Sequence, residues 1–272
     1  MATAKINGVN LYYELTGSGR DPMVFVHGSW VDHQSWELVA KELAKDFRVL
    51  TYDRRGHSQS ERVIGQGNIN EDVKDLITLV EEFDLSPAHI VGNSFGGNIV
   101  LRTAATRPDI FKSMLVHEPP LLSLIEDDPN VQGILPEIDK TFQQVVNLIL
   151  GGNRAKAAQI FVDQIALGSG SWEQLPEMIK KSFVFNAMTW YDELQDPQSL
   201  QIDLSSLSNF KKPTLLSTGS DSPPFFPIII DCLKASLAQA KQITIDGAGH
   251  VPQMSHPEKY IDMVKGFCLQ TT

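Results

Sequence analysis

The sequence has little cysteine, no long apolar run and no excess of basic charge. Its two cysteines, Cys232 and Cys268, lie far apart and fit no metal-ligand spacing. They exclude a disulfide framework and suit a reducing compartment. No apolar stretch approaches the roughly 18 residues that a membrane span needs, and the first residues do not resemble a signal peptide. We therefore expect a cytoplasmic protein that has no membrane partner.

Basic residues are in the minority: 23 Lys and Arg stand against 33 Asp and Glu, which gives a net charge of −10. An acidic chain of this kind is a poor partner for nucleic acid, so none is expected. Hydrophobic residues at 42% and charged residues at 21% are ordinary for a globular enzyme. The length of 272 residues predicts one large domain, or a core with an insertion. We expect a monomer or homodimer.

The most informative segment is 90–97, where Gly92, Ser94 and Gly96 form a G-x-S-x-G pattern. A short apolar, β-branched run precedes the serine and a helical pattern follows it. A sharp strand-to-helix turn of this kind holds the serine hydroxyl away from its neighbours. The pattern predicts Ser94 as a nucleophile.

Strands alternate with helices on both sides of a helical block. This rhythm predicts an α/β fold with a doubly wound, mostly parallel sheet. It stops at Pro119 and Pro120 and resumes at Pro213. We expect a core formed by residues 1–118 and 207–272, with a helical cap inserted at 119–206. The expected cap helices are 134–150, 154–167 and 172–188.

A serine nucleophile needs a base, and histidine is the usual one because its pKa lies near neutrality. Of seven histidines, His250 lies in a glycine-rich loop directly after the last expected strand. Loops at the carboxyl ends of parallel strands meet at one crevice, so this loop can reach Ser94. We predict His250 as the base, with His27, His57 and His117 as weaker candidates.

The histidine in turn needs a carboxylate that fixes its tautomer. Two candidates follow strands: Glu118 comes after the strand that follows Ser94, and Asp221 comes after the strand that precedes the last one. Either residue preserves the chain order serine, acid, histidine. The residues alone leave both open.

A tetrahedral intermediate also needs hydrogen-bond donors for its oxyanion. We predict the backbone N–H of Phe95 and that of Ser29 for this role. Aromatic residues of the expected cap predict a mainly apolar pocket between core and cap, and we expect Trp30 and Trp190 to contact the small-molecule substrate. No metal and no cofactor are expected.

With these residues in place, the chain resembles the α/β-hydrolase superfamily over nearly its full length. The matching segments are His27-Gly28, residues 52–60, the Ser94 turn and Gly249-His250. A minority of that superfamily, including haloalkane dehalogenase relatives and zearalenone-lactonase-like enzymes, places a glutamate after the strand that follows the turn. Glu118, in His-Glu-Pro-Pro, is similar to that arrangement, so the resemblance favours it over Asp221.

The resemblance also implies a reaction. Dehalogenases and epoxide hydrolases of this fold use aspartate where this chain has Ser94, so serine implies attack on an acyl carbon. We expect a serine hydrolase that cleaves a small-to-medium, mainly apolar carboxylic ester or lactone through an acyl-enzyme. The alternatives are a carbon–carbon bond hydrolase, a haloperoxidase-like enzyme, or a ligand receptor that keeps the hydrolase machinery.

Overall fold

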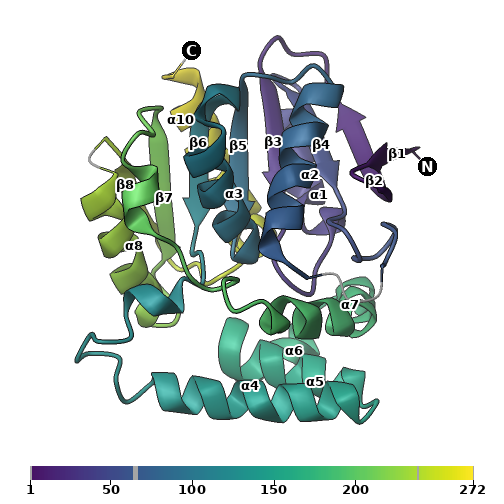
Figure 1. Ribbon diagram of the computed structural model, residues 1–272, viewed down its shortest axis with the longest axis vertical. Helices are drawn as coiled ribbons and strands as arrows, with labels where there is room; N and C mark the ends of the chain where they lie inside the picture. The colour runs from purple at the N-terminus through teal and green to yellow at the C-terminus, as the bar shows by residue number, and fades with distance from the viewer. Residues whose placement is uncertain (1, 64–66, 238, 272) are drawn as a thin grey trace.

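A computed structural model describes residues 2–63, 67–237 and 239–271 (Figure 1). Within these residues the strands form one eight-stranded sheet in the order β1-β2-β4-β3-β5-β6-β7-β8. The β1–β2 and β2–β4 pairs are antiparallel, and the remaining pairs are parallel. Helices cover both faces, so the expected doubly wound, mostly parallel α/β fold is confirmed.

The elements follow the expected order along the chain. The strands are β1 (Ala2–Ile6), β2 (Val9–Thr16), β3 (Pro22–Val26), β4 (Arg48–Tyr52), β5 (Ala88–Asn93), β6 (Phe111–His117), β7 (Thr214–Gly219) and β8 (Lys241–Ile245). The helices are α1 (Glu37–Leu43), α2 (Ile69–Glu82), α3 (Phe95–Thr106), α4 (Leu135–Leu150), α5 (Arg154–Phe161), α6 (Ser171–Gln174), α7 (Glu177–Gln195), α8 (Phe225–Ser236), α9 (Pro252–Ser255) and α10 (Pro257–Leu269).

The central strands are apolar on both faces because helices pack against each side. In β3, Val24 and Val26 belong to the cluster shared with α2, α3 and α8. Met23 and Phe25 point the other way and pack with α1 and α10. Burying one such side chain stabilises the fold by about 1.5–3 kcal/mol. A continuous apolar run of five residues therefore becomes a central strand.

Between β6 and β7 the described chain contains helices and short 3₁₀ turns, and α4 to α7 lie together beneath one end of the sheet (Figure 1). The single helix expected at 172–188 is wrong: α6 ends at Gln174 and α7 begins at Glu177. Pro176 is the reason, because it has no N–H and forces Leu175 into an extended conformation. The helix expected at 154–167 likewise changes, and ends as a π-helical turn at Val162–Ala166. The division into core and cap at residues 119 and 206 stays a prediction.

Helix α7 turns one polar row toward the sheet, with spacing four, three and four: Ser182, Asn186, Thr189 and Glu193. We call this row the polar face of α7. Ser182 Oγ donates to Asp32 Oδ2 at 2.7 Å, in the loop after β3.

Two further residues of the polar face, Asn186 and Thr189, contact the same region of the core. Asn186 Nδ2 donates to the carbonyls of Trp30 and Val31, both at 3.2 Å. Thr189 Oγ1 lies 3.0 Å from His57 Nε2, in the loop after β4. Hydrogen bonds at successive turns thus fasten α7 to the two loops that follow β3 and β4.

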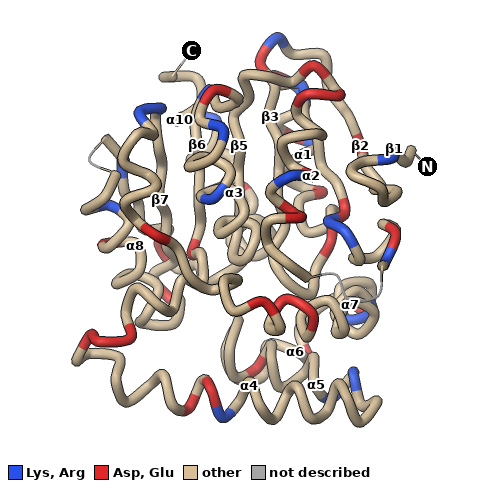
Figure 2. Tube along the Cα trace, in the orientation of Figure 1, with Lys and Arg blue, Asp and Glu red and all other residues tan. Residues whose placement is uncertain are grey.

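Among the described residues, every helix is too short or too polar to cross a membrane. Lys and Arg are scattered among Asp and Glu along the trace and do not gather into one basic face (Figure 2). Cytoplasmic location and the absence of a nucleic-acid partner stay predictions.

Acid is expected to destabilise the fold through buried histidines. Burial lowers the pKa of His89 and of His117 to about 4, from an ordinary value of 6.5. The unfolded chain therefore binds more protons between pH 6.5 and 4, so the stabilisation is fully present above pH 6.5 and is lost as the pH falls. Each histidine should contribute a loss of about 3 kcal/mol by pH 4. Urea unfolding at pH 7, 5.5 and 4 measures the free energy of unfolding. In His89→Gln this free energy should fall less steeply with decreasing pH than in the wild type. A free energy of unfolding that is constant over this range would contradict the expectation.

Candidate active site

Ser94 lies on a strained turn between β5 and α3. Its backbone has φ +56° and ψ −128°, a region that residues with a Cβ rarely occupy. The turn is tight because Gly96 packs on β3: a Cβ there would lie 2.2 Å from the carbonyl oxygen of Val26. The Ser94 side chain is half-buried and lines the wall of a cavity. A serine presented in this way is accessible to a ligand in the cavity.

Gly28, in the loop that follows β3, lies directly beside Ser94. A Cβ on Gly28 would lie 2.9 Å from the Cβ of Ser94 and 3.4 Å from its Oγ. Glycine is the only residue that allows the backbone at 28–29 to approach the serine this closely.

His250 lies between β8 and α9 and lines the same cavity as Ser94. Its Nδ1 is 2.8 Å from Glu118 Oε2. Phe226 stacks on the ring, with centroids 4.6 Å apart and an interplanar angle of 14°. Asn93 Nδ2 donates to the backbone carbonyl of His250 at 2.9 Å, which ties the loop to the residue before Ser94. The imidazole is thus held by a ring, a carboxylate and its own backbone.

Glu118 is fully buried at the end of β6, and its backbone has φ +46°. Its Oε1 accepts a hydrogen bond from the N–H of Gly219 at 2.7 Å, and its Oε2 faces His250. Burial alone would raise the pKa of this carboxyl, but His117 and His250 outweigh it and hold the pKa below its usual value. A carboxylate bonded to Nδ1 leaves Nε2 free to accept a proton.

Asp221 is placed differently from Glu118. It is exposed, and the hydrogen bond to its carboxylate comes from Ser220 Oγ at 2.8 Å. Its backbone N–H donates to the carbonyl of Ala248 at 2.9 Å, so the residue shapes the turn before α8. The structure brings Glu118, and not Asp221, to His250 Nδ1.

The two candidate oxyanion donors both border the Ser94 cavity. Phe95 is the first residue of α3, and the first N–H groups of a helix have no intrahelical acceptor. The Gly28 carbonyl accepts hydrogen bonds from His27 Nδ1 at 2.8 Å and from Arg54 Nη1 at 3.4 Å. Because a trans peptide points its carbonyl and N–H in opposite directions, the N–H of Ser29 faces away from His27 and Arg54.

The cavity at Ser94 has two adjoining parts that share five lining residues. Both parts are lined by Ser29, Ser94, Phe161, Ala166 and His250. Besides Ser29, Ser94 and His250, two polar residues line the larger part, Glu193 and Ser199. The remaining lining residues are apolar, as sites for small organic ligands usually are.

The two predicted substrate contacts are not placed alike. Trp190, on α7, lines the larger part of the cavity. Trp30 is fully buried behind that wall, where it stacks on Phe161 with centroids 4.9 Å apart and packs against Trp190 at 5.2 Å. The structure therefore places Trp30 as support for the wall rather than in its lining.

Glu193 is a site residue that the sequence pattern does not single out. It lies on α7, is 3% exposed, and accepts hydrogen bonds from Ser29 Oγ at 2.5 Å and from Arg54 Nη2 at 2.7 Å. Burial raises the pKa of this carboxyl, although Arg54 and Ser29 favour its charged form. Its separation of 164 residues from Ser29 explains why no local motif could reveal the contact.

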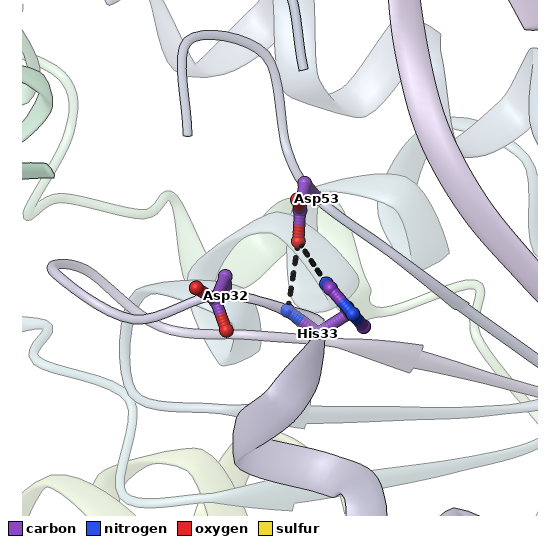
Figure 3. Close-up of side chains that lie close together, drawn as sticks. All are labelled: Asp32, His33 and Asp53. Carbon is purple, nitrogen blue, oxygen red and sulfur yellow. Dashed lines mark hydrogen bonds and ion pairs between the residues drawn. The ribbon is translucent and has the colours of Figure 1, made fainter. Parts of the chain in front are cut away.

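Asp32, His33 and Asp53 form a compact buried group whose ligand atoms lie within 4.8 Å of one another (Figure 3). Asp53 Oδ1 accepts from the N–H of His33 at 2.9 Å and from its Nδ1 at 2.6 Å. Burial alone would lower the pKa of His33, but the hydrogen bond and charge of Asp53 raise it. The carboxylate oxygens of Asp32 accept from Gln34 N–H, Ser58 Oγ and Ser182 Oγ. These oxygens are engaged within the protein, so the group fits a hydrogen-bonded brace between loops better than a cation site.

The class of protein follows from comparison with known families. The model of the alpha/beta hydrolase fold family matches residues 21–257, and this chain belongs to that family. The expected resemblance is thereby confirmed.

Among curated proteins, the chain is 35% identical over 126 residues to the uncharacterized hydrolase YraK of Bacillus subtilis (strain 168), which covers 45% of this chain and 46% of that protein. It is 32% identical over 103 residues to the dihydrolipoyllysine-residue acetyltransferase component of the acetoin cleaving system of Pseudomonas putida, which covers 38% and 28%. The matches span less than half the length of these relatives.

Solved structures share the fold over nearly the whole chain. A bromoperoxidase from Bacillus anthracis superposes with a TM-score of 0.81 at 24% identity and covers 98% of both chains. The enol-lactonase from Burkholderia xenovorans LB400 has a TM-score of 0.79 at 20% identity, covering 98% of this chain and 100% of its own. Est816, described as an N-acyl homoserine lactone degrading enzyme, has a TM-score of 0.79 at 21% identity, again covering 98% and 100%.

Proposed function

We propose that this protein is a serine hydrolase that cleaves a small-to-medium, mainly apolar carboxylic ester or lactone. The observation that carries the proposal is the arrangement of Ser94 and His250 on one apolar cavity, with the imidazole Nδ1 bonded to the buried Glu118. Nucleophile, base and orienting acid are the parts that acyl transfer to serine requires.

In the proposed reaction, His250 Nε2 takes the Ser94 hydroxyl proton while Ser94 Oγ attacks the acyl carbon. The N–H groups of Ser29 and Phe95 donate to the oxyanion of the tetrahedral intermediate. The intermediate collapses, and the alcohol leaves with the proton held by His250. Water then attacks the acyl-enzyme by the same route, which releases the acid and restores Ser94. Glu118 keeps the imidazole in the required tautomer and stabilises its charged form.

The shape and polarity of the cavity support the substrate class. Two mainly apolar parts meet at Ser94, so the groups on either side of a scissile acyl bond can each occupy one part. The neighbouring structures that are a lactonase and a lactone-degrading enzyme have the same fold, which is compatible with this class.

The test uses two readouts on the wild-type protein. A serine-directed fluorophosphonate should label it covalently, and peptide mapping should find the label on Ser94. A panel of p-nitrophenyl esters and aliphatic lactones should show turnover, with kcat/KM higher for neutral apolar acyl groups than for acyl groups that carry a carboxylate. Absence of both labelling and turnover would overturn the proposal, and labelling without turnover would favour the receptor alternative.

A further inference from the structure

The loop that carries Ser29 is tied to the cap through buried charges. Ser29 Oγ donates to Glu193 Oε2 at 2.5 Å, and Glu193 Oε1 accepts from Arg54 Nη2 at 2.7 Å. Arg54 also donates through Nε to Asp72 Oδ1, at 3.0 Å, on α2. One chain of hydrogen bonds therefore runs from α2, beside the sheet, through Arg54 to α7 and back to Ser29.

The charged residues of this hydrogen-bond network are buried. Arg54 is 1% exposed, Glu193 3% and Asp72 4%. Arg54 lies between two carboxylates, and its guanidinium group stands 4.7 Å from the centroid of the Phe95 ring. In a buried setting, charge-assisted hydrogen bonds are short and directional, and they fix the atoms that they join. The two residues whose N–H groups we assign to the oxyanion, Ser29 and Phe95, are thus both in contact with the same network.

Arg54 and Glu193 hold the two ends of the Ser29 peptide unit. Arg54 Nη1 donates to the carbonyl of Gly28, on one side of the peptide bond. Glu193 accepts from the Ser29 side chain, on the other side. The peptide between them lies so close to Ser94 that a Cβ on Gly28 would clash with the serine side chain. Its rotation would swing the Ser29 N–H away from the position of the oxyanion.

We propose that Glu193 and Arg54 are positioning residues: through the Ser29 hydroxyl and the Gly28 carbonyl, they fix the orientation of the Ser29 N–H, so that cap helix α7 completes the oxyanion site of the core. This inference rests on the proposed function. Donors that are already oriented before charge develops stabilise the transition state more than the bound substrate. Loss of the hydrogen bond between Ser29 and Glu193 should therefore lower kcat and leave KM nearly unchanged.

The sharpest variant is Ser29→Ala, which keeps the backbone N–H and removes the hydroxyl that reaches Glu193. Glu193→Gln is the second variant, since it keeps the shape of the side chain and removes the charge that pairs with Arg54. Ser182→Ala is the matched control, because Ser182 Oγ also joins α7 to a carboxylate of the loop after β3, at 2.7 Å, without lining the cavity.

Three quantities are measured for each variant with one p-nitrophenyl ester: kcat, KM, and the inhibition constant of a trifluoromethyl ketone, which adds to Ser94 as a tetrahedral adduct. For Ser29→Ala and Glu193→Gln, kcat should fall about 10- to 100-fold, a loss typical of a misaligned catalytic group. The inhibition constant should rise in parallel and KM should change less than about threefold. Ser182→Ala should keep the wild-type values.

Two other results would overturn the inference. A wild-type kcat in Ser29→Ala, or an effect on KM alone, would mean that the Ser29–Glu193 hydrogen bond is only structural. In that case, labelling of the wild-type protein by a fluorophosphonate would still support the proposed function. A wild-type protein that neither takes the label nor binds the ketone would remove both. If Glu193→Gln fails to fold, Ser29→Ala alone decides, because it deletes a single, partly buried hydroxyl and no charge.

Discussion

Replacing Ser94 with alanine is expected to lower kcat/KM for an activated ester by about 10³- to 10⁶-fold, the range seen when a serine nucleophile is removed. The reason is that the variant lacks the hydroxyl that we propose attacks the acyl carbon and forms the acyl-enzyme. Steady-state kinetics with a p-nitrophenyl ester measures the loss. Retention of more than about a tenth of the activity would show that Ser94 is not the nucleophile.

A matched variant separates loss of chemistry from loss of fold. Ser94 has φ +56°, and alanine keeps the Cβ that is strained there, whereas glycine does not. Ser94→Gly should therefore be as inactive as Ser94→Ala but more stable by about 1 kcal/mol in urea unfolding. A Ser94→Gly protein that is less stable than Ser94→Ala would contradict the assignment of strain to this turn.

Replacing Glu118 with glutamine is expected to reduce kcat by about 10³- to 10⁴-fold. An amide can donate to His250 Nδ1 and thereby favour the tautomer that has its proton on Nε2, where it cannot accept the proton of Ser94. The buried site offers the imidazole no other carboxylate at hydrogen-bond distance from Nδ1 among the described residues. Turnover of a p-nitrophenyl ester, with circular dichroism to confirm folding, measures the effect.

Asp221→Asn is the control for this experiment, since Asp221 is the other carboxylate that the sequence leaves open. The side chain is exposed and bonded to Ser220, so activity should stay within about twofold of wild type, as for most surface substitutions. A large loss in Asp221→Asn together with near-normal turnover in Glu118→Gln would reverse the assignment.

The sheet is predictable from the sequence because its signals are local. Short β-branched runs such as residues 23–26 become strands wherever helices can cover both faces, and the turn at Ser94 requires small residues within two positions of the serine. The same local signals carry the family resemblance, which the family match confirms. The roles of Ser94, His250 and Glu118 stay predictions, although the structure brings these residues together.

The helical block is harder to predict, because its helices are shaped by tertiary contacts. Helix α7 leaves Met178 and Phe185 exposed, at 57% and 63%, while Asn186 and Glu193 are buried. The sequence predicts a helix over much of α7, but it cannot reveal that the inward face is partly polar, since polar residues are expected on the outer side. The contacts of Glu193 and the position of Trp30 behind the cavity wall depend on packing between segments more than 100 residues apart.

The polar face of α7 also determines how the cavity can open. Because hydrogen bonds join α7 to the loops after β3 and β4, displacing α7 would require these bonds to break. The segment at 162–176 contains a π-helical turn, a single-turn helix and Pro176, and it borders the cavity through Ile165, Ala166, Leu167 and Leu175. We therefore expect any motion that admits a ligand to this cavity to occur in segment 162–176 rather than in α7.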